Sequence, residues 1–231
     1  MAFFFVDICQ MSELADDSAD PPDLSFLRQT EERRALNQYW YSSRTITAIA
    51  RELEDVGGSV AFLSTPSIYF SLPDESQVRA QSVVFDFDRQ WDTHPNFRFF
   101  DFHQPGAIDS ALWRSFDWVV VDPPFITRDV WELYADAVKL CLKPGGRVMC
   151  TTVPENEAVL RDLFGQEVGA LRKARFMPAM QNAKLPYQYA LFLNYEPSAN
   201  SALAAWNIEV PRDLEASNSS TMETAAVVVE R

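Results

Sequence analysis

The stretch Trp118-Val119-Val120-Val121-Asp122-Pro123-Pro124-Phe125 decides the fold. Its first four residues are apolar, and a carboxylate and two prolines follow them directly. Four consecutive apolar residues are typical of a strand that is buried on both faces of a parallel sheet. In open α/β sheets, the chemistry takes place beyond the carboxyl ends of such strands. The run therefore predicts an α/β fold with a candidate active site at residues 122–125.

Residues 122–125 have the chemistry to bind an amino group. Neither Pro123 nor Pro124 has a backbone N–H, so the local carbonyls and the Asp122 oxygens can only accept hydrogen bonds. Asp122 would accept one hydrogen bond from the amine, a proline carbonyl would accept a second, and Phe125 would supply an apolar or stacking face. The alternative is that Asp-Pro-Pro only ends the strand, because both residue types are common in turns.

Strand and helix patterns alternate along the chain on both sides of this run. Strands are expected at 59–64, 81–87, 97–100, 117–121, 147–152, 175–177 and 189–194. Helices are expected at 31–55, where Gly57-Gly58 follows, and at about 107–115, 128–142 and 154–164. The alternation predicts a mostly parallel sheet with helices on both faces. The last two strands are separated by no helical pattern, so we expect them to pair antiparallel.

The composition narrows the choice of partners. The formal net charge of −13 repels phosphate backbones and attracts basic proteins, which argues against a nucleic-acid partner. Three cysteines and two histidines show no metal-ligand spacing and no paired framework, so we expect no metal site and a reducing, cytosolic compartment. No stretch approaches membrane-spanning length, so we expect no membrane association.

Asp122-Pro123-Pro124-Phe125 resembles the Asp/Asn-Pro-Pro-aromatic motif of amino-group methyltransferases that use S-adenosyl-L-methionine. Three further segments fall in the order found in one branch of these enzymes: Asn37-Gln38-Tyr39-Trp40-Tyr41-Ser42, Phe85-Asp86-Phe87-Asp88-Arg89 and Phe192-Leu193-Asn194-Tyr195. This branch is the elongation factor 1-alpha lysine methyltransferase family, whose members were once described as adenine-N6 DNA methyltransferases. The resemblance implies a class I methyltransferase-like (Rossmann-like) fold, with a mostly parallel sheet, helices on both faces and an antiparallel last strand.

The resemblance covers about residues 31–197, which we expect to form the methyltransferase domain. Residues 1–30 contain six acidic residues and one basic residue, and we expect them to form a flexible acidic N-terminal segment. Residues 198–231 are rich in Ser, Ala, Asn and Thr, and we expect a mobile C-terminal extension. Within this extension, Trp206, Ile208 and Val210 alternate as they would in an edge strand.

Cofactor-binding carboxylates are expected after the second and third strands. Asp86 and Asp88 follow the second strand, where a carboxylate can accept both ribose hydroxyls, and a period of two puts both on the same face. We favour Asp86, with Asp88 pairing with Arg89 or fixing the loop. After the third strand, Asp101 would accept from the exocyclic amine of adenine and Phe102 would pack on its ring. The alternative for this second pair is a solvated loop acid and a core phenylalanine.

The loop after the first strand, Ser64-Thr65-Pro66-Ser67, has none of the glycines that most class I methyltransferases place there. The family that the chain resembles also has Ser and Pro in this loop, so the resemblance places Ser64, Thr65 and Pro66 at the cofactor. By residue pattern alone, the loop would be an ordinary turn.

The resemblance also implies roles for two segments outside the strand ends. In the family, the segment around residue 40 lies over the cofactor, so Tyr41 and Ser42 are candidates for its methionine end and Trp40 for the amine channel. The helical spacing of these residues would by itself place them in the core. Asn182 precedes the last strand in a loop that borders the substrate opening in this fold, which makes it a candidate substrate-binding residue.

The function implied by the resemblance is protein-lysine N-methylation of a basic translation factor, elongation factor 1-alpha. One alternative is an adenine-N6 nucleic-acid methyltransferase, which would stack a flipped base on Phe125. The acidic composition and the lack of a basic, aromatic-interleaved stripe argue against it. Another alternative is a catalytically silent scaffold with the methyltransferase fold. The intact motif at residues 122–125 argues against the scaffold, although the missing glycines leave it open.

Overall fold

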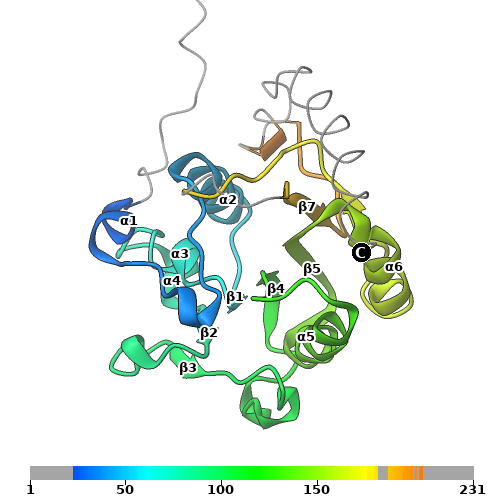
Figure 1. Cartoon of the computed structure of the whole chain (residues 1–231), viewed down its shortest axis with the longest axis horizontal. Helices are drawn as coiled ribbons and strands as arrows, with labels where there is room; N and C mark the ends of the chain where they lie inside the picture. Colours follow the sequence, from blue (N-terminus) through cyan, green and yellow to red (C-terminus); the bar gives the residue numbers. More distant parts are fainter. Residues whose placement is uncertain (1–22, 182–186, 200, 202, 205–231) are drawn as a thin grey trace, which may run out of the picture.

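The computed structural model describes residues 23–181, 187–199, 201, 203 and 204. In these residues, the strands form one sheet in the order β3-β2-β1-β4-β5-β7-β6 (Figure 1). The parallel strands are β1 (Val60–Leu63), β2 (Val83–Asp86), β3 (Phe97–Phe99), β4 (Phe116–Val121) and β5 (Leu142–Thr152). Strand β7 (Ala190–Leu193) runs antiparallel to β5 and to β6 (Arg172–Lys173). The predicted sheet is confirmed, including the antiparallel pairing of its last two strands.

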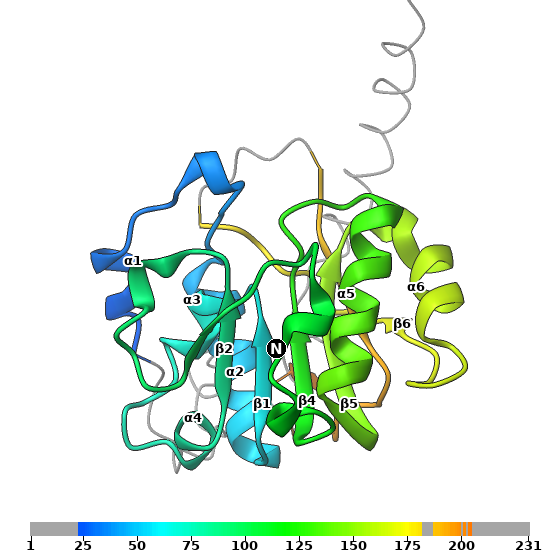
Figure 2. The ribbon, with the colours of Figure 1, turned by 90° about the horizontal axis from the view of Figure 1, so that it is seen from below.

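Helices cover both faces of this sheet, as predicted. Successive side chains of a strand point to opposite faces. Val60 and Phe62 of β1 accordingly belong to a core with helix α2 (Ser43–Val56), whereas Ala61 and Leu63 belong to a core with α5 (Arg128–Cys141) and α6 (Glu157–Phe164). Figures 1 and 2 show α2 on one side of the strands and α5 and α6 on the other.

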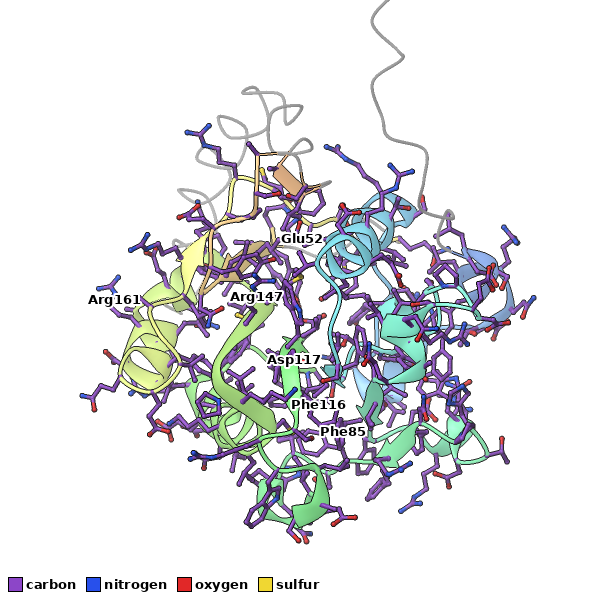
Figure 3. All side chains as sticks on the ribbon, turned by 180° about the vertical axis from the view of Figure 1, so that it is seen from behind. Glu52, Phe85, Phe116, Asp117, Arg147 and Arg161 are labelled. Carbon is purple, nitrogen blue, oxygen red and sulfur yellow. The ribbon has the colours of Figure 1, made fainter. Side chains whose placement is uncertain are left out.

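Short helices connect these layers. They are α1 (Ser25–Gln29), α3 (Pro66–Tyr69), α4 (Gln77–Ala80) and the 3-10 turns η2 (Arg34–Leu36), η3 (Arg89–Trp91), η4 (Pro105–Ala107), η5 (Ser110–Leu112) and η6 (Pro154–Asn156). Aromatic rings fill much of the interior on the α5 side. Phe85 of β2 and Phe116 of β4, both labelled in Figure 3, meet edge to face with ring centroids 6.1 Å apart.

The helix predicted at 31–55 is wrong in its first half. Within residues 31–36 only the 3-10 turn η2 forms, and Asn37 then adopts the left-handed conformation with φ of 52°. The next residues are extended, because Tyr41 forms an antiparallel bridge with Met180, and the α-helix begins at Ser43. Tertiary hydrogen bonds therefore outweigh the helical spacing in this segment. The predicted end of the helix is correct, since Gly57 follows α2 with φ of 71°.

Two further elements differ from the predictions. The segment predicted as a helix at 107–115 forms only the turns η4 and η5, because the Asp109 side chain accepts a hydrogen bond from the Ala111 N–H and starts a new turn. Strand β6 lies at Arg172–Lys173 and not at 175–177. Phe176, which suggested the later position, is buried from a loop, whereas the strand itself is exposed and polar.

The packed part of the molecule begins before residue 31, where the domain boundary was expected. Phe26 of α1 is only 6% exposed, stacks on Phe70 with centroids 5.8 Å apart, and meets Trp40 edge-on at 5.1 Å. The predicted edge pattern at residues 206–210 lies outside the described residues, as do residues 1–22. None of the helices in the described ranges is long and apolar enough to cross a membrane.

Candidate active site

A cavity of about 270 Å³ lies at the carboxyl ends of the parallel strands. Ser64 follows β1, Asp86 ends β2 and Asp122 follows β4, and all three residues line the cavity. Parallel strands end at the same edge of a sheet, so residues far apart in sequence converge there. The position agrees with the one predicted from the apolar run and Asp122.

The structure brings most of the predicted site residues together. Those that line the cavity are Trp40, Tyr41, Ser64, Pro66, Asp86, Asp101, Phe102, Asp122, Pro123, Pro124 and Phe125. Ser42, Thr65 and Asp88 do not line it, and the structure gives each of them another task. Asn182 lies outside the described residues.

The two oxygens of the Asp122 carboxylate have different surroundings. Oδ2 accepts a hydrogen bond from the Tyr41 hydroxyl at 2.6 Å. Oδ1 is buried, and no donor reaches it from the described part of the chain. Burial raises the pKa of Asp122 to about 7, and the hydrogen bond from Tyr41 opposes this effect. A buried acceptor without a donor is costly, so Oδ1 is a prepared position for a donor on a bound molecule.

The segment 33–41 crosses from the end of β2 to the end of β4. It is tied down near β2, where Arg33 Nη1 donates to Asp88 Oδ1 at 2.8 Å, and near β4, where Asn37 Nδ2 donates to the Pro124 carbonyl. In Figure 2 this segment, in blue, lies beyond the upper ends of the strands. Because Asn37 occupies the Pro124 carbonyl, the proline carbonyl left for an incoming amine is that of Pro123, to which no described residue donates.

Asp86 and Asp88 have separate tasks. Asp88 is buried and saturated by the protein, since it accepts from Arg33, from the Gln90 N–H at 3.0 Å and from Gln90 Nε2 at 2.7 Å. The expected pairing of Asp88 with Arg89 is wrong, because Arg89 contacts Asp92 at 3.3 Å. Asp88 does fix the loop, as the alternative prediction had it.

Asp86 is the carboxylate that faces the cavity. Its Oδ1 accepts from the Asp88 N–H at 2.8 Å, and Asp86 lines the cavity, whereas Asp88 does not. Burial raises the pKa of Asp86 to about 7, and the nearby charge of Asp88 adds to this effect. Because it lines the cavity, Asp86 is the member of the pair that is able to hold a hydroxyl-bearing ligand.

Aromatic and acidic groups line the part of the cavity that is formed by the residues after β3. Asp101 Oδ1 accepts from the His103 N–H at 3.0 Å and lies 2.8 Å from His103 Nδ1, and these contacts hold the Asp101 pKa below its usual value. Phe102 stacks on His103, with centroids 4.1 Å apart, and on Tyr134 at 5.6 Å. The cavity therefore offers an ionised acceptor next to flat apolar surfaces.

The loop after β1 manages without glycine because Ser64 takes the strained conformation itself. Its φ is 55°, in the left-handed region that glycine usually occupies. Its Oγ lies 2.6 Å from the Tyr134 hydroxyl, which ties the loop to α5. Thr65 is buried and donates to the Val120 carbonyl at 3.4 Å, so it supports the loop from below and does not line the cavity.

Ser42, which was predicted at the methionine end of the cofactor, caps helix α2 and does not line the cavity. Its Oγ accepts from the Thr45 N–H at 3.3 Å. We predict that Ser42→Ala lowers the free energy of unfolding by about 1 kcal/mol, the usual cost of losing a serine cap, and leaves ligand affinity unchanged. Urea unfolding and titration calorimetry measure the two quantities, with exposed Ser43→Ala as the control. A tenfold loss of affinity in Ser42→Ala would contradict the capping role.

Several cavity residues were missed by sequence reasoning. Tyr134 reads as an ordinary core position of α5, and Phe87 and Tyr189 carry no pattern that separates them from core aromatics. Asn37 had one usable signal, because asparagine is favoured in the left-handed conformation that it adopts. The others are recruited by tertiary packing, which single-sequence patterns do not encode.

Comparison with known proteins agrees with this geometry. The model of the family described as "Probable N6-adenine methyltransferase" matches residues 32–197. The EEF1A lysine methyltransferase 1 of Danio rerio is 30% identical over 169 residues, which are 70% of this chain and 97% of that protein. The chain belongs to the EEF1A lysine methyltransferase family. The family resemblance predicted from the motifs is thereby confirmed.

Other members of the EEF1A lysine methyltransferase family and one solved structure complete the comparison. The Bos taurus EEF1A lysine methyltransferase 1 is 27% identical over 179 residues, which are 75% of this chain and 76% of that protein. A branched-chain polyamine synthase from Thermus thermophilus superposes with a TM-score of 0.53 at 14% identity, covering 76% of this chain and 64% of the other. At that identity the similarity concerns the fold alone.

Proposed function

We propose that the protein is an S-adenosylmethionine-dependent protein-lysine N-methyltransferase that acts on elongation factor 1-alpha. The observation that carries the proposal is the buried Asp122 Oδ1, an acceptor without a donor at the wall of the cavity. Phe125, which is 49% exposed, lines the same cavity and offers an apolar face to an incoming side chain. Membership of the family supports the choice of lysine as the acceptor.

The cavity residues fit the cofactor. The Asp86 carboxylate would accept from the ribose hydroxyls, and Asp101 would accept from the adenine amine beside Phe102 and the half-exposed Phe87. Ser64 and Pro66 shape the floor of the cavity between these groups. When bound, S-adenosylmethionine supplies an electrophilic methyl group on its sulfonium sulfur.

The protein's task at the other end of the cavity is to present a neutral amine in line with that methyl group. A lysine amine has an ordinary pKa of about 10.4, so fewer than about one in a thousand is neutral at pH 7. The apolar surfaces of Phe125 and Trp40 favour the neutral form, whereas ionised Asp122 attracts the ammonium form. Asp122 therefore receives and orients the amine, and the proton of the lysine ammonium group leaves to water. Alignment of the neutral amine with the methyl group supplies much of the acceleration.

Charge supports a protein substrate. A net charge of −13 favours approach of a basic protein over that of a phosphate backbone. The cytosol, where translation takes place, is the compartment that goes with this substrate. The described cysteines, Cys141 and Cys150, are free and buried, which suits a reducing compartment.

The test offers labelled S-adenosylmethionine and the purified protein to a cell lysate, with parallel nuclease and protease treatments. Label in a band of the size of elongation factor 1-alpha, removed by protease and lost when the lysines of the factor are replaced, is the expected result. The Asp122→Ala protein in the same lysate controls for methyltransferases of the lysate. Label that resists protease and disappears with nuclease would overturn the proposal in favour of adenine methylation.

A further inference from the structure

Two buried side chains, Tyr41 and Thr151, form a hydrogen-bonded chain that ends on the Asp122 carboxylate. Tyr41 is 2% exposed, and Thr151, at the end of β5, is 3% exposed. The Tyr41 hydroxyl lies within hydrogen-bond distance of both Asp122 Oδ2 and Thr151 Oγ1. Because Tyr41 has one proton and gives it to the carboxylate, Thr151 must donate to the Tyr41 oxygen. The chain therefore runs in one direction, from Thr151 through Tyr41 to Asp122, and each bond polarises the next.

The backbone leaves Tyr41 little freedom to move. Its neighbours pair with the segment 179–181 on both sides, since the Ser42 N–H donates to the Ala179 carbonyl and the Gln181 N–H donates to the Trp40 carbonyl, both at 2.8 Å. Thr151 is held in the sheet opposite Leu191 of β7. The Tyr41 hydroxyl, which Thr151 holds in turn, thus occupies Oδ2 of the carboxylate, and the buried Oδ1 is the oxygen that is left free.

We propose that Tyr41 and Thr151 are positioning residues that hold Asp122 by Oδ2 and thereby reserve Oδ1 for the amine of the substrate. This inference rests on the proposed function, since it assigns how the same site receives lysine. Tyr41 does not act as the base, because burial and the neighbouring Asp122 raise its pKa well above its usual value and keep it protonated. Tyr41 contributes a hydrogen bond to Asp122 Oδ2 and keeps its proton throughout the reaction.

The arrangement predicts how activity depends on pH. Burial raises the Asp122 pKa and the Tyr41 hydrogen bond lowers it, so removal of the Tyr41 hydroxyl moves it further upward. A protonated Asp122 has lost the negative charge that attracts the ammonium form. The acidic limb of the pH–rate profile should therefore move to higher pH when the hydroxyl is removed.

The other ionisable groups around Asp122 do not obscure the dependence of activity on pH. Cys150 of β5, Tyr134 of α5 and Tyr189 before β7 all have pKa values raised by burial, so they remain neutral from pH 5 to 9. Asp86, on the cofactor side, also titrates near pH 7. Saturating cofactor and a comparison of variants with the wild type remove its contribution.

Tyr41→Phe is the decisive variant and Thr151→Val the supporting one. Tyr195→Phe is the matched control, because the Tyr195 hydroxyl also donates to a buried carboxylate, that of Glu52 on α2 (Figure 3), away from the cavity. In Tyr41→Phe we expect the midpoint of the acidic limb of kcat to move to higher pH by about one unit, which corresponds to the free energy of one charge-assisted hydrogen bond. Activity should fall about tenfold at pH 6 and recover at pH 9, with unchanged cofactor affinity. Thr151→Val should shift the limb less, and Tyr195→Phe not at all.

A second readout needs no substrate. The ¹³C-carboxyl resonance of Asp122, assigned by its absence in Asp122→Asn, reports the pKa directly in each folded variant. An upward shift in Tyr41→Phe and none in Tyr195→Phe supports the positioning role, whereas an unchanged Asp122 titration in Tyr41→Phe overturns it. An unshifted pH–rate profile in an active Tyr41→Phe enzyme overturns it as well. A wild-type protein that methylates no protein substrate would instead overturn the proposed function.

Discussion

Replacing Asp122 with alanine is expected to lower the rate of methyl transfer by at least about 100-fold, while the affinity for S-adenosylmethionine stays within a few fold. The loss has two sources: the buried acceptor for the amine disappears, and the Tyr41 hydroxyl loses its carboxylate partner. The cofactor contacts that we propose, Asp86 and Asp101, lie at other strand ends, so cofactor binding should be nearly unaffected. Near-normal turnover in a folded Asp122→Ala protein would remove Asp122 from the mechanism.

The comparison with Asp122→Asn separates the acceptor from its charge. Asparagine keeps an oxygen that can accept from the amine, and the motif of amino-group methyltransferases contains either residue. We expect Asp122→Asn to retain more activity than Asp122→Ala and to lose the acidic limb that Asp122 produces in the wild type. Rates measured from pH 5.5 to 9 with saturating cofactor test this. An acidic limb that persists unchanged in Asp122→Asn would show that another group titrates.

The sheet was predictable because its strands are marked by local pattern. The run 118–121 is apolar at every position, as burial on both faces requires, and β1, β2, β4 and β7 appear within a few residues of their expected bounds. The segment 31–42 was not predictable, because its apolar residues repeat with a helical period while its conformation is set by distant partners. Arg33 with Asp88 and Asn37 with Pro124 are contacts across 55 and 87 residues that no local pattern encodes.

The candidate site also contains residues that local pattern predicts and residues that depend on distant contacts. Residues at or just after the ends of strands, such as Asp86, Asp101 and Asp122, were predicted because strand ends converge in this fold. The sequence alone offered two carboxylates after β2, and the choice depends on which one the protein already saturates. Tyr41 was expected at the cofactor, but its hydroxyl contacts Asp122. This contact depends on the antiparallel bridge between Tyr41 and Met180, which no local sequence pattern predicts.

Removing the Asp86 carboxylate is the most direct test of the cofactor end. We expect Asp86→Ala to weaken cofactor binding by about 1.5 to 3 kcal/mol, the range for hydrogen bonds to a charged group, which is roughly 10- to 150-fold. Asp88→Ala should act differently, because Asp88 holds Arg33 and Gln90 and does not line the cavity. It should lower the free energy of unfolding and affect affinity less. A larger loss of affinity in Asp88→Ala than in Asp86→Ala would reverse the assignment.

The pH dependence of binding gives the same assignment a second test. Because burial raises the Asp86 pKa to about 7, the carboxylate is ionised above that pH and becomes protonated as the pH falls through it. A protonated Asp86 would lose the proposed charge-assisted hydrogen bonds to the ribose, so affinity should decrease from pH 8 to pH 6. S-adenosylhomocysteine is the better probe, since its neutral sulfur removes the attraction between the sulfonium and Asp122, which also titrates near 7. Calorimetry should show this decrease in the wild type and a flat profile in Asp86→Asn, and a wild-type affinity independent of pH would place the ribose contact elsewhere.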